Sequence, residues 1–135
     1  MSKFRAVFDT NIFLSAILYG GIPLELLNFW RKEKLFKLVI SPEILAELIT
    51  KLRTKFVFPP NLVREWQELL TLNIIHTLPE YLTHICRDDD DKIIDTAISG
   101  NAHYIITGDD DLLTIKSYRK IEIIKPREFL NLLKR

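Results

Sequence analysis

Aspartate residues are concentrated in one part of this 135-residue chain. Eight of the nine lie between positions 88 and 111, as the run 88–91, Asp95 and the triplet 109–111, and the ninth is Asp9. Carboxylates at such density repel one another unless they are solvated, protonated or bound to a cation. Oxygen ligands without cysteine or histidine are typical of Mg²⁺ or Mn²⁺ sites. The pattern therefore predicts a divalent-metal site.

The charges of the chain are segregated along its length. Residues 88–111 carry eight aspartates against Lys92, a balance of −7, and the rest of the chain has a balance of +8. An acidic pocket within a basic surface suits an enzyme that binds a polyanion and cuts it with a metal ion. A surface divided by chance has the same composition, because charge asymmetry alone is only a hint of function.

Length and composition predict one globular domain over residues 1–135. The chain is 47% hydrophobic and 27% charged, which is ordinary for a folded protein. No apolar run reaches the length of a membrane span and the N-terminus shows no targeting peptide, so we expect a cytoplasmic protein with no membrane contact. Cys86 is the single cysteine, which excludes an internal disulfide and a cysteine-based zinc site.

Short apolar runs alternate with segments of helical periodicity. Strands are expected at 5–8, 36–40, 73–76, 104–107 and 121–124. Apolar side chains at helical spacing predict helices around 12–17, 24–30, 44–52, 62–70 and 93–98, at 112–113 and from 126 onward. This alternation predicts a three-layer α/β/α domain, Rossmann-like, with a largely parallel sheet of about five strands.

The expected sheet collects the acids at one edge. Ligands of parallel sheets bind beyond the carboxyl ends of the strands, where Asp9 follows the first strand and Asp109 the fourth. Ser41 and Pro42 are typical of a helix start at the end of the second strand. Glu47 lies about one turn into that helix. The helix that starts with the acidic run leads into the fourth strand from the far side, so its N-terminus is expected at the same edge.

Structural roles explain some of these acids equally well. Asp9 is suited to cap the helix that follows it, as is Asn11. Glu47 is one turn from Lys51, so an exposed ion pair along the helix is the simpler interpretation of its position alone. In the run 88–91, one or two acids satisfy the positive end of a helix dipole whereas four repel, which favours metal binding.

Helical periodicity separates the acids of that run from one another. Asp90 shares the apolar stripe of Ile94, so it is expected to point toward the sheet and to bind the metal. Asp91 lies about 100° further round, with Asp95, and is expected to support the site from outside or to face solvent. Residues 88–89 are expected to precede the first turn and to cap the helix.

Four short motifs occur in a fixed order along the chain. They are Val7-Phe8-Asp9-Thr10-Asn11, Ser41-Pro42-Glu43-Ile44-Leu45-Ala46-Glu47-Leu48, the Cys86-Arg87-Asp88 run, and Tyr104-Ile105-Ile106-Thr107-Gly108-Asp109 with Asp111-Leu112-Leu113. Together they resemble the PIN domain family, and most closely the VapC-like or PilT-like toxins of prokaryotic toxin–antitoxin pairs. The resemblance covers nearly the whole chain and ends in a tail at 126–130 that such proteins often show.

The resemblance implies a set of site residues. The four acids that would hold the metal and carry catalysis are Asp9, Glu47, Asp90 and Asp109, with Asn11 and Thr107 as polar support and Asp95 and Asp111 as outer contacts. Relatives often carry a proline in the acidic run, and this chain lacks it and is one residue shorter. Asp89 or Asp91 can therefore replace Asp90 as the third ligand.

The resemblance also implies a function. It predicts a Mg²⁺- or Mn²⁺-dependent endoribonuclease that cuts single-stranded RNA to leave a 5′-phosphate, a homodimer, and an antitoxin partner that blocks the acidic groove. The alternatives are a free-standing RNA-processing nuclease without an antitoxin, a metal-dependent phosphatase and a catalytically silent binding domain. Asn11 argues against a phosphatase with a second aspartate two residues after its nucleophile, and the complete set of acids argues against a silent domain.

Overall fold

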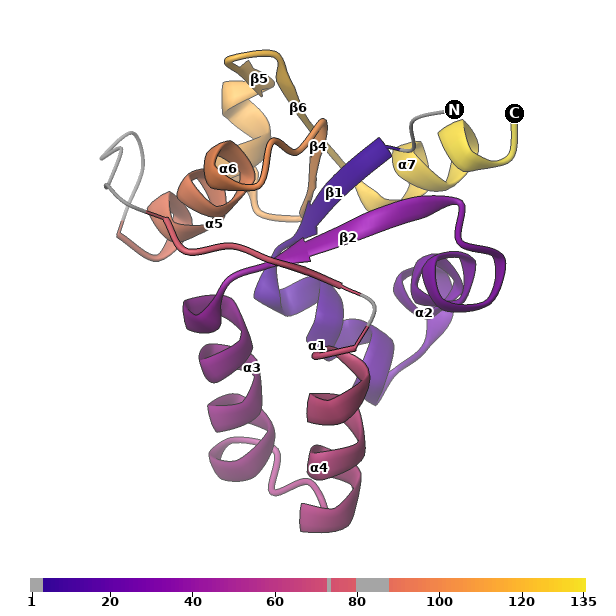
Figure 1. Ribbon diagram of the computed structural model, residues 1–135, viewed down its shortest axis with the longest axis vertical. Helices are drawn as coiled ribbons and strands as arrows, with labels where there is room; N and C mark the ends of the chain where they lie inside the picture. The colour runs from indigo at the N-terminus through magenta and orange to yellow at the C-terminus, as the bar shows by residue number, and fades with distance from the viewer. Residues whose placement is uncertain (1–3, 73, 80–87) are drawn as a thin grey trace.

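The computed structural model describes residues 4–72, 74–79 and 88–135. Within these ranges one sheet lies between helices on both faces (Figure 1). Its strands are β1 (Phe4–Phe8), β2 (Phe36–Ile40), β3 (Ile75–His76), β4 (Tyr104–Ile106), β5 (Ser117–Tyr118) and β6 (Ile121–Ile124). Their order is β3-β2-β1-β4-β6-β5, and only β5 runs antiparallel to its neighbour. The predicted three-layer architecture with a largely parallel sheet is confirmed.

Helices connect the strands in the order that the apolar periodicity predicts. They are α1 (Thr10–Leu18), α2 (Gly21–Asn28), the π-helix η1 (Phe29–Glu33), α3 (Pro42–Thr54), α4 (Pro60–Leu69), α5 (Asp88–Ser99), α6 (Asp110–Ile115) and α7 (Pro126–Leu133). The start of α3 follows from its sequence, because Ser41 Oγ accepts a hydrogen bond from the backbone N–H of Ile44 and Pro42 occupies the first helical position.

The two faces of the sheet are covered by different helices. On one face the rings of Phe8 and Phe36 lie 5.9 Å apart, and Phe36 lies 5.0 Å from Phe129 of α7. Phe8 also packs against Phe13 of α1, so α1 and α7 share this face. On the opposite face α5 packs against β1, β2 and β4. This arrangement places the N-terminal end of α5 beside the carboxyl ends of the central strands (Figure 1).

Several local details differ from the sequence-based predictions. Strand β5 and the π-helix η1 were not predicted, and β3 spans two residues, with Asn73 outside the described part of the chain. Residues 88–89 lie within the first turn of α5, so the prediction that they precede it is wrong. Residues 86–87 lie outside the described ranges.

The described residues contain no single helix with the length and apolar character of a membrane span. Only a bent pair, Thr10–Leu18 with Gly21–Glu33, passes the same criteria of length and composition, and its two parts meet at 99°. Phe13, Leu26 and Trp30 of this pair are buried in the core of the domain.

Candidate metal centre

Asp9 is positioned by the pairing of the two central strands. Phe8 of β1 lies opposite Ile106 of β4, and the backbone N–H of Asp9 donates to the carbonyl of Ile106 at 3.0 Å. Asp9 and Thr107 are the residues that follow these two strands, and Thr107 Oγ1 donates a hydrogen bond to Asp9 Oδ2 at 2.8 Å. Asp9 occupies the N-cap position of α1 but its side chain makes no capping hydrogen bond. Its carboxylate is therefore directed across the sheet edge toward β4.

Thr107 also connects Asp9 to the next acid. It is fully buried, and its Oγ1 accepts a hydrogen bond from the backbone N–H of Asp109 at 3.0 Å. Asp109 in turn caps α6, because its Oδ1 accepts from the backbone N–H of Asp111 at 3.2 Å. A single buried hydroxyl thus sets the relative positions of Asp9 and Asp109.

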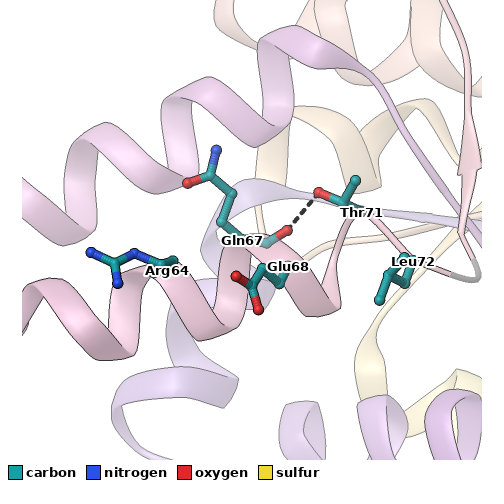
Figure 2. A pocket seen from close by; sticks show the side chains of 5 residues that line it. All are labelled: Arg64, Gln67, Glu68, Thr71 and Leu72. Carbon is teal, nitrogen blue, oxygen red and sulfur yellow. Dashed lines mark hydrogen bonds between the residues drawn. The ribbon is translucent and has the colours of Figure 1, made fainter.

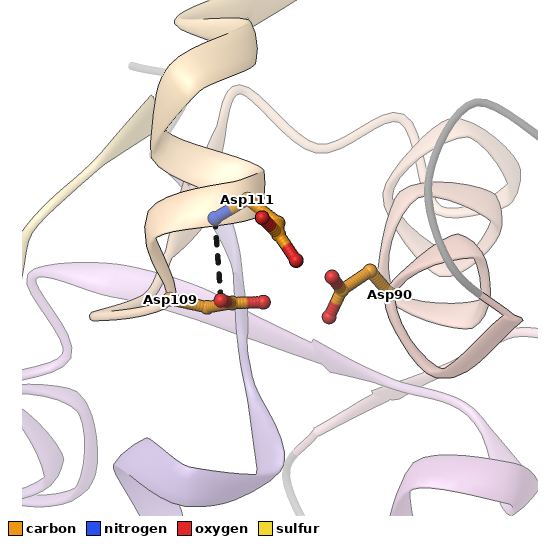
Figure 3. Close-up of side chains that lie close together, drawn as sticks. All are labelled: Asp90, Asp109 and Asp111. Carbon is orange, nitrogen blue, oxygen red and sulfur yellow. Dashed lines mark hydrogen bonds between the residues drawn. The ribbon is translucent and has the colours of Figure 1, made fainter.

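Three carboxylates converge across the gap between α5 and α6. Asp90 projects from the first turn of α5 toward Asp109 and Asp111 at the start of α6 (Figure 3). One oxygen of each of these three residues lies within 4.8 Å of the other two. Asp90 and Asp109 are half-buried and Asp111 is exposed, so the cluster faces an opening rather than the core.

The crowding of negative charge perturbs the acids at this edge. Burial raises the pKa of Asp90 to about 7, together with a hydrogen bond with Asp109. The charges of Asp109, Asp9 and Asp111 act in the same direction. Burial also raises the pKa of Asp9, and the hydrogen bond from Thr107 opposes that rise only in part. The carboxylates are thus held together at an energetic cost that a proton or a cation relieves.

Glu47 approaches the same site from α3 but contacts a different group. Its Oε2 lies 2.5 Å from Nζ of Lys92 on α5. Burial raises the pKa of Glu47, but the hydrogen bonds of Lys92 and Thr10 and the charges of Lys92 and Lys51 together lower it by more, so the net shift is downward. The expected partner along the helix, Lys51, contributes a smaller electrostatic effect. The ion pair that holds Glu47 therefore joins two helices instead of two turns of one helix.

A pocket of about 270 Å³ connects these groups. Its lining includes six residues that the sequence singled out, which are Asp9, Asn11, Glu47, Asp90, Asp109 and Asp111. It also includes Thr10, Lys51 and Lys92, which were not predicted. Lys92 had a detectable signal, since it is the only lysine or arginine between positions 88 and 111.

The second acidic stripe of α5 does not reach the pocket. Asp91 and Asp95 are 3% and 2% exposed, and neither lines it. The prediction that Asp91 faces solvent is wrong, because its side chain is buried. That Asp91 supports the site from outside or binds the metal stays a prediction. Periodicity alone could not show the burial of Asp91, because α5 is buried on most of its circumference, from Ile93 through Ala97.

The donors of the pocket fit a hard divalent cation. They are carboxylate oxygens, and octahedral Mg²⁺ holds adjacent ligand oxygens about 3 Å apart and opposite ones about 4 Å apart. The oxygens of the three clustered acids lie within 4.8 Å of one another, so they need to close by at most about 2 Å. The Oγ1 of Thr10 is buried at the pocket beside Glu47, whose pKa it lowers, and offers one more oxygen. Asp9, Asp90, Asp109 and Asp111 are thus suited to hold one ion.

A larger pocket of about 430 Å³ lies at the C-terminal end of α4 (Figure 2). It is lined by Arg64, Gln67, Glu68, Thr71 and Leu72, and Thr71 Oγ1 donates to the carbonyl of Gln67 at 2.6 Å. All five side chains belong to one helix and the turn after it, and all are exposed. This surface brings together no group of acids comparable to the cluster at α5 and α6.

Comparisons with known proteins show the family to which the chain belongs. The family model described as PIN domain matches residues 5–111. An uncharacterized protein of Methanocaldococcus jannaschii, MJ1680, is 32% identical over 143 residues, which cover 95% of this chain and 90% of that protein. The crystal structure of VapBC2 from Rickettsia felis bound to a DNA fragment from their promoter contains a chain of the same fold. It has a TM-score of 0.62 and 17% identity, and the match covers 90% of this chain and 98% of that one. The chain therefore belongs to the PIN domain family.

Proposed function

We propose that this protein is a metal-dependent endoribonuclease that cuts single-stranded RNA with Mg²⁺ or Mn²⁺. The observation that carries the proposal is the convergence of Asp90, Asp109 and Asp111, with oxygens within 4.8 Å, on the pocket that Asp9 also lines. A divalent ion held there would neutralise phosphate oxygens and lower the pKa of a bound water. Membership of the PIN domain family supports the same chemistry.

The residues of the chain have separate tasks in this proposal. The carboxylate of Asp9 is held by the hydroxyl of Thr107, and that of Asp109 by the backbone N–H of Asp111. Asp90 lies on the opposite wall of the pocket, on α5, and closes the ligand set. Lys51 lines the same pocket and is suited to contact a phosphate of the bound strand, since its charge opposes that of the polyanion.

The partners follow from the same likeness and belong to the proposal. VapBC2 of Rickettsia felis was crystallised with a DNA fragment from its promoter. We propose by analogy that this chain is the toxin of a cytoplasmic toxin–antitoxin pair, acts as a homodimer and is inhibited by a cognate antitoxin. A free-standing RNA-processing nuclease is the alternative, and expression of the chain alone separates the two, because a toxin arrests growth without its antitoxin.

Cleavage of a single-stranded RNA in Mg²⁺ or Mn²⁺, with and without excess chelator, tests the activity. We expect cleavage only with metal, and its loss in Asp109→Asn. The matched control is Asp110→Asn, because Asp110 is the exposed neighbour in the same triplet and does not line the pocket. Equal cleavage in chelator, or full activity of Asp109→Asn, contradicts the proposal.

A further inference from the structure

Lys92 places a fixed positive charge inside the acidic pocket. Its Nζ lies 2.5 Å from Glu47 Oε2, and the Lys92 and Glu47 side chains are 15% and 25% exposed. Both residues line the pocket that contains the carboxylate cluster. An ion pair sheltered to this degree interacts more strongly than one on the surface, because water screens it less.

Neighbouring hydrogen bonds hold the two helices of this pair together. The hydroxyl of Thr96, on α5, donates to the carbonyl of Lys92 at 2.7 Å. The same hydroxyl lies 2.9 Å from Oγ of Ser41, the residue that caps α3. Thr96 and Ser41 are both buried. The Lys92 backbone and the start of the helix that carries Glu47 are therefore joined through the Thr96 hydroxyl, which holds the ammonium group in a defined position relative to Glu47.

The acids of the pocket consequently fall into two groups. Asp90, Asp109 and Asp111 have oxygens close enough for one shared cation, and Asp9 and Glu47 lie outside that group. Asp9 borders the cluster, since its charge raises the pKa of Asp90. Glu47 instead has a cation of its own, which is part of the protein. Sites with two metal ions hold them about 4 Å apart and use carboxylates on both sides. Here the carboxylate on the α3 side, that of Glu47, is already neutralised by Lys92.

We propose that Lys92 takes the place of a second metal ion, so that the site binds one divalent cation and the chain supplies the other positive charge. This inference rests on the proposed function, because it assumes that the carboxylate cluster holds a metal. It assigns Glu47 the task of positioning Lys92 instead of ligating the ion. Glu47 is then the positioning residue of the site, and the removal of Lys92 should change the number of ions bound.

The number of Mn²⁺ ions bound per chain, measured by calorimetry and by equilibrium dialysis, tests the inference without RNA. We expect one ion for the wild-type protein and two for Lys92→Met, in which Glu47 is free to act as a ligand. The double variant Lys92→Met with Glu47→Gln should return to one ion. Lys51→Met is the matched control, since Lys51 lines the same pocket on α3, and should bind one ion.

A second variant keeps the inference testable if Lys92→Met does not fold. Glu47→Gln retains Lys92, and we expect it to bind one Mn²⁺ with an affinity within about threefold of the wild type, because Glu47 is not a ligand. Two ions in the wild type, one ion in folded Lys92→Met, or a loss of affinity above tenfold in Glu47→Gln overturns the inference alone. Absence of Mn²⁺ binding in the wild type overturns the proposed function as well.

Discussion

Asp90→Asn should stabilise the metal-free protein at pH 8. Burial and the neighbouring acids raise the pKa of Asp90 from 3.8 to about 7. A shift of this size corresponds to at most about 4 kcal/mol of unfolding free energy, since one pKa unit is about 1.4 kcal/mol. Asp90 is only partly buried, so screening by water reduces the expected gain to about 1–2 kcal/mol, or roughly 3–8 °C in Tm.

The sign of the effect depends on pH in a definite way. The pKa of Asp90 is higher in the folded state, so the folded protein holds this proton more tightly than the unfolded chain does. The associated stability is fully present below about pH 4 and is lost as the pH rises toward 7. Asparagine resembles the protonated acid and does not titrate, so the variant keeps this contribution to stability at every pH. The excess in unfolding free energy of Asp90→Asn over the wild type should therefore grow from pH 4 to 7 and then remain constant.

Urea and thermal unfolding in excess chelator at pH 4.5, 6 and 8 provide the measurement. Asp110→Asn is the matched control, because Asp110 is exposed and should change stability by less than about 1 kcal/mol. Added Mn²⁺ should reverse the order of stability, since binding at 100 times the Kd adds about 2.7 kcal/mol to the wild type and much less to the variant. An Asp90→Asn protein that is no more stable than the wild type at pH 8 without metal refutes the reasoning.

Three further predictions concern the same site and its scaffold. The affinity for Mn²⁺ should rise about tenfold per pH unit below pH 7 and change little above it, because Asp90 must lose its proton before it binds the ion. Calorimetry between pH 5.5 and 8 checks this, and an affinity that does not change with pH contradicts it. Thr107→Val should weaken Mn²⁺ binding and lower stability by about 1–3 kcal/mol, because it removes the hydrogen bond to Asp9, while Thr107→Ser should retain both properties. Gly100→Ala should destabilise the fold by about 1–3 kcal/mol, because a Cβ there would overlap Cγ1 of Val39, and adding Val39→Ala should recover part of that loss in urea unfolding.

The main elements of the fold could be predicted because their signals are local. The apolar run at 36–40 forms β2 over the same residues, and Ser41-Pro42 starts α3 as predicted. Elements of two residues, such as β5, lie below the length at which alternation can be recognised. Strand β5 forms because β6 offers it an unpaired edge, which is a property of the assembled sheet.

The approach of the acids was also partly encoded in the chain order. Asp9 and Asp109 follow neighbouring parallel strands, so topology alone brings them to one edge. The position of Asp90 on the apolar stripe of α5 predicted that its side chain faces the sheet edge, and Asp90 does line the pocket. The burial of Asp91 was not predictable, because the helical period shows the most apolar stripe of α5 but not how far the surrounding elements cover its other sides.

Chain order and periodicity by themselves determined an α/β domain with its acids at the carboxyl edge of the sheet, because strand alternation and helical spacing are set by residues close in sequence. Only the tertiary structure decided which charge meets which. Glu47 has a lysine one turn away, yet its ion pair is with Lys92, 45 residues distant. Packing of α3 against α5, joined by Ser41 and Thr96, brings the two side chains together in a sheltered pocket, where their attraction exceeds that of an exposed pair on one helix.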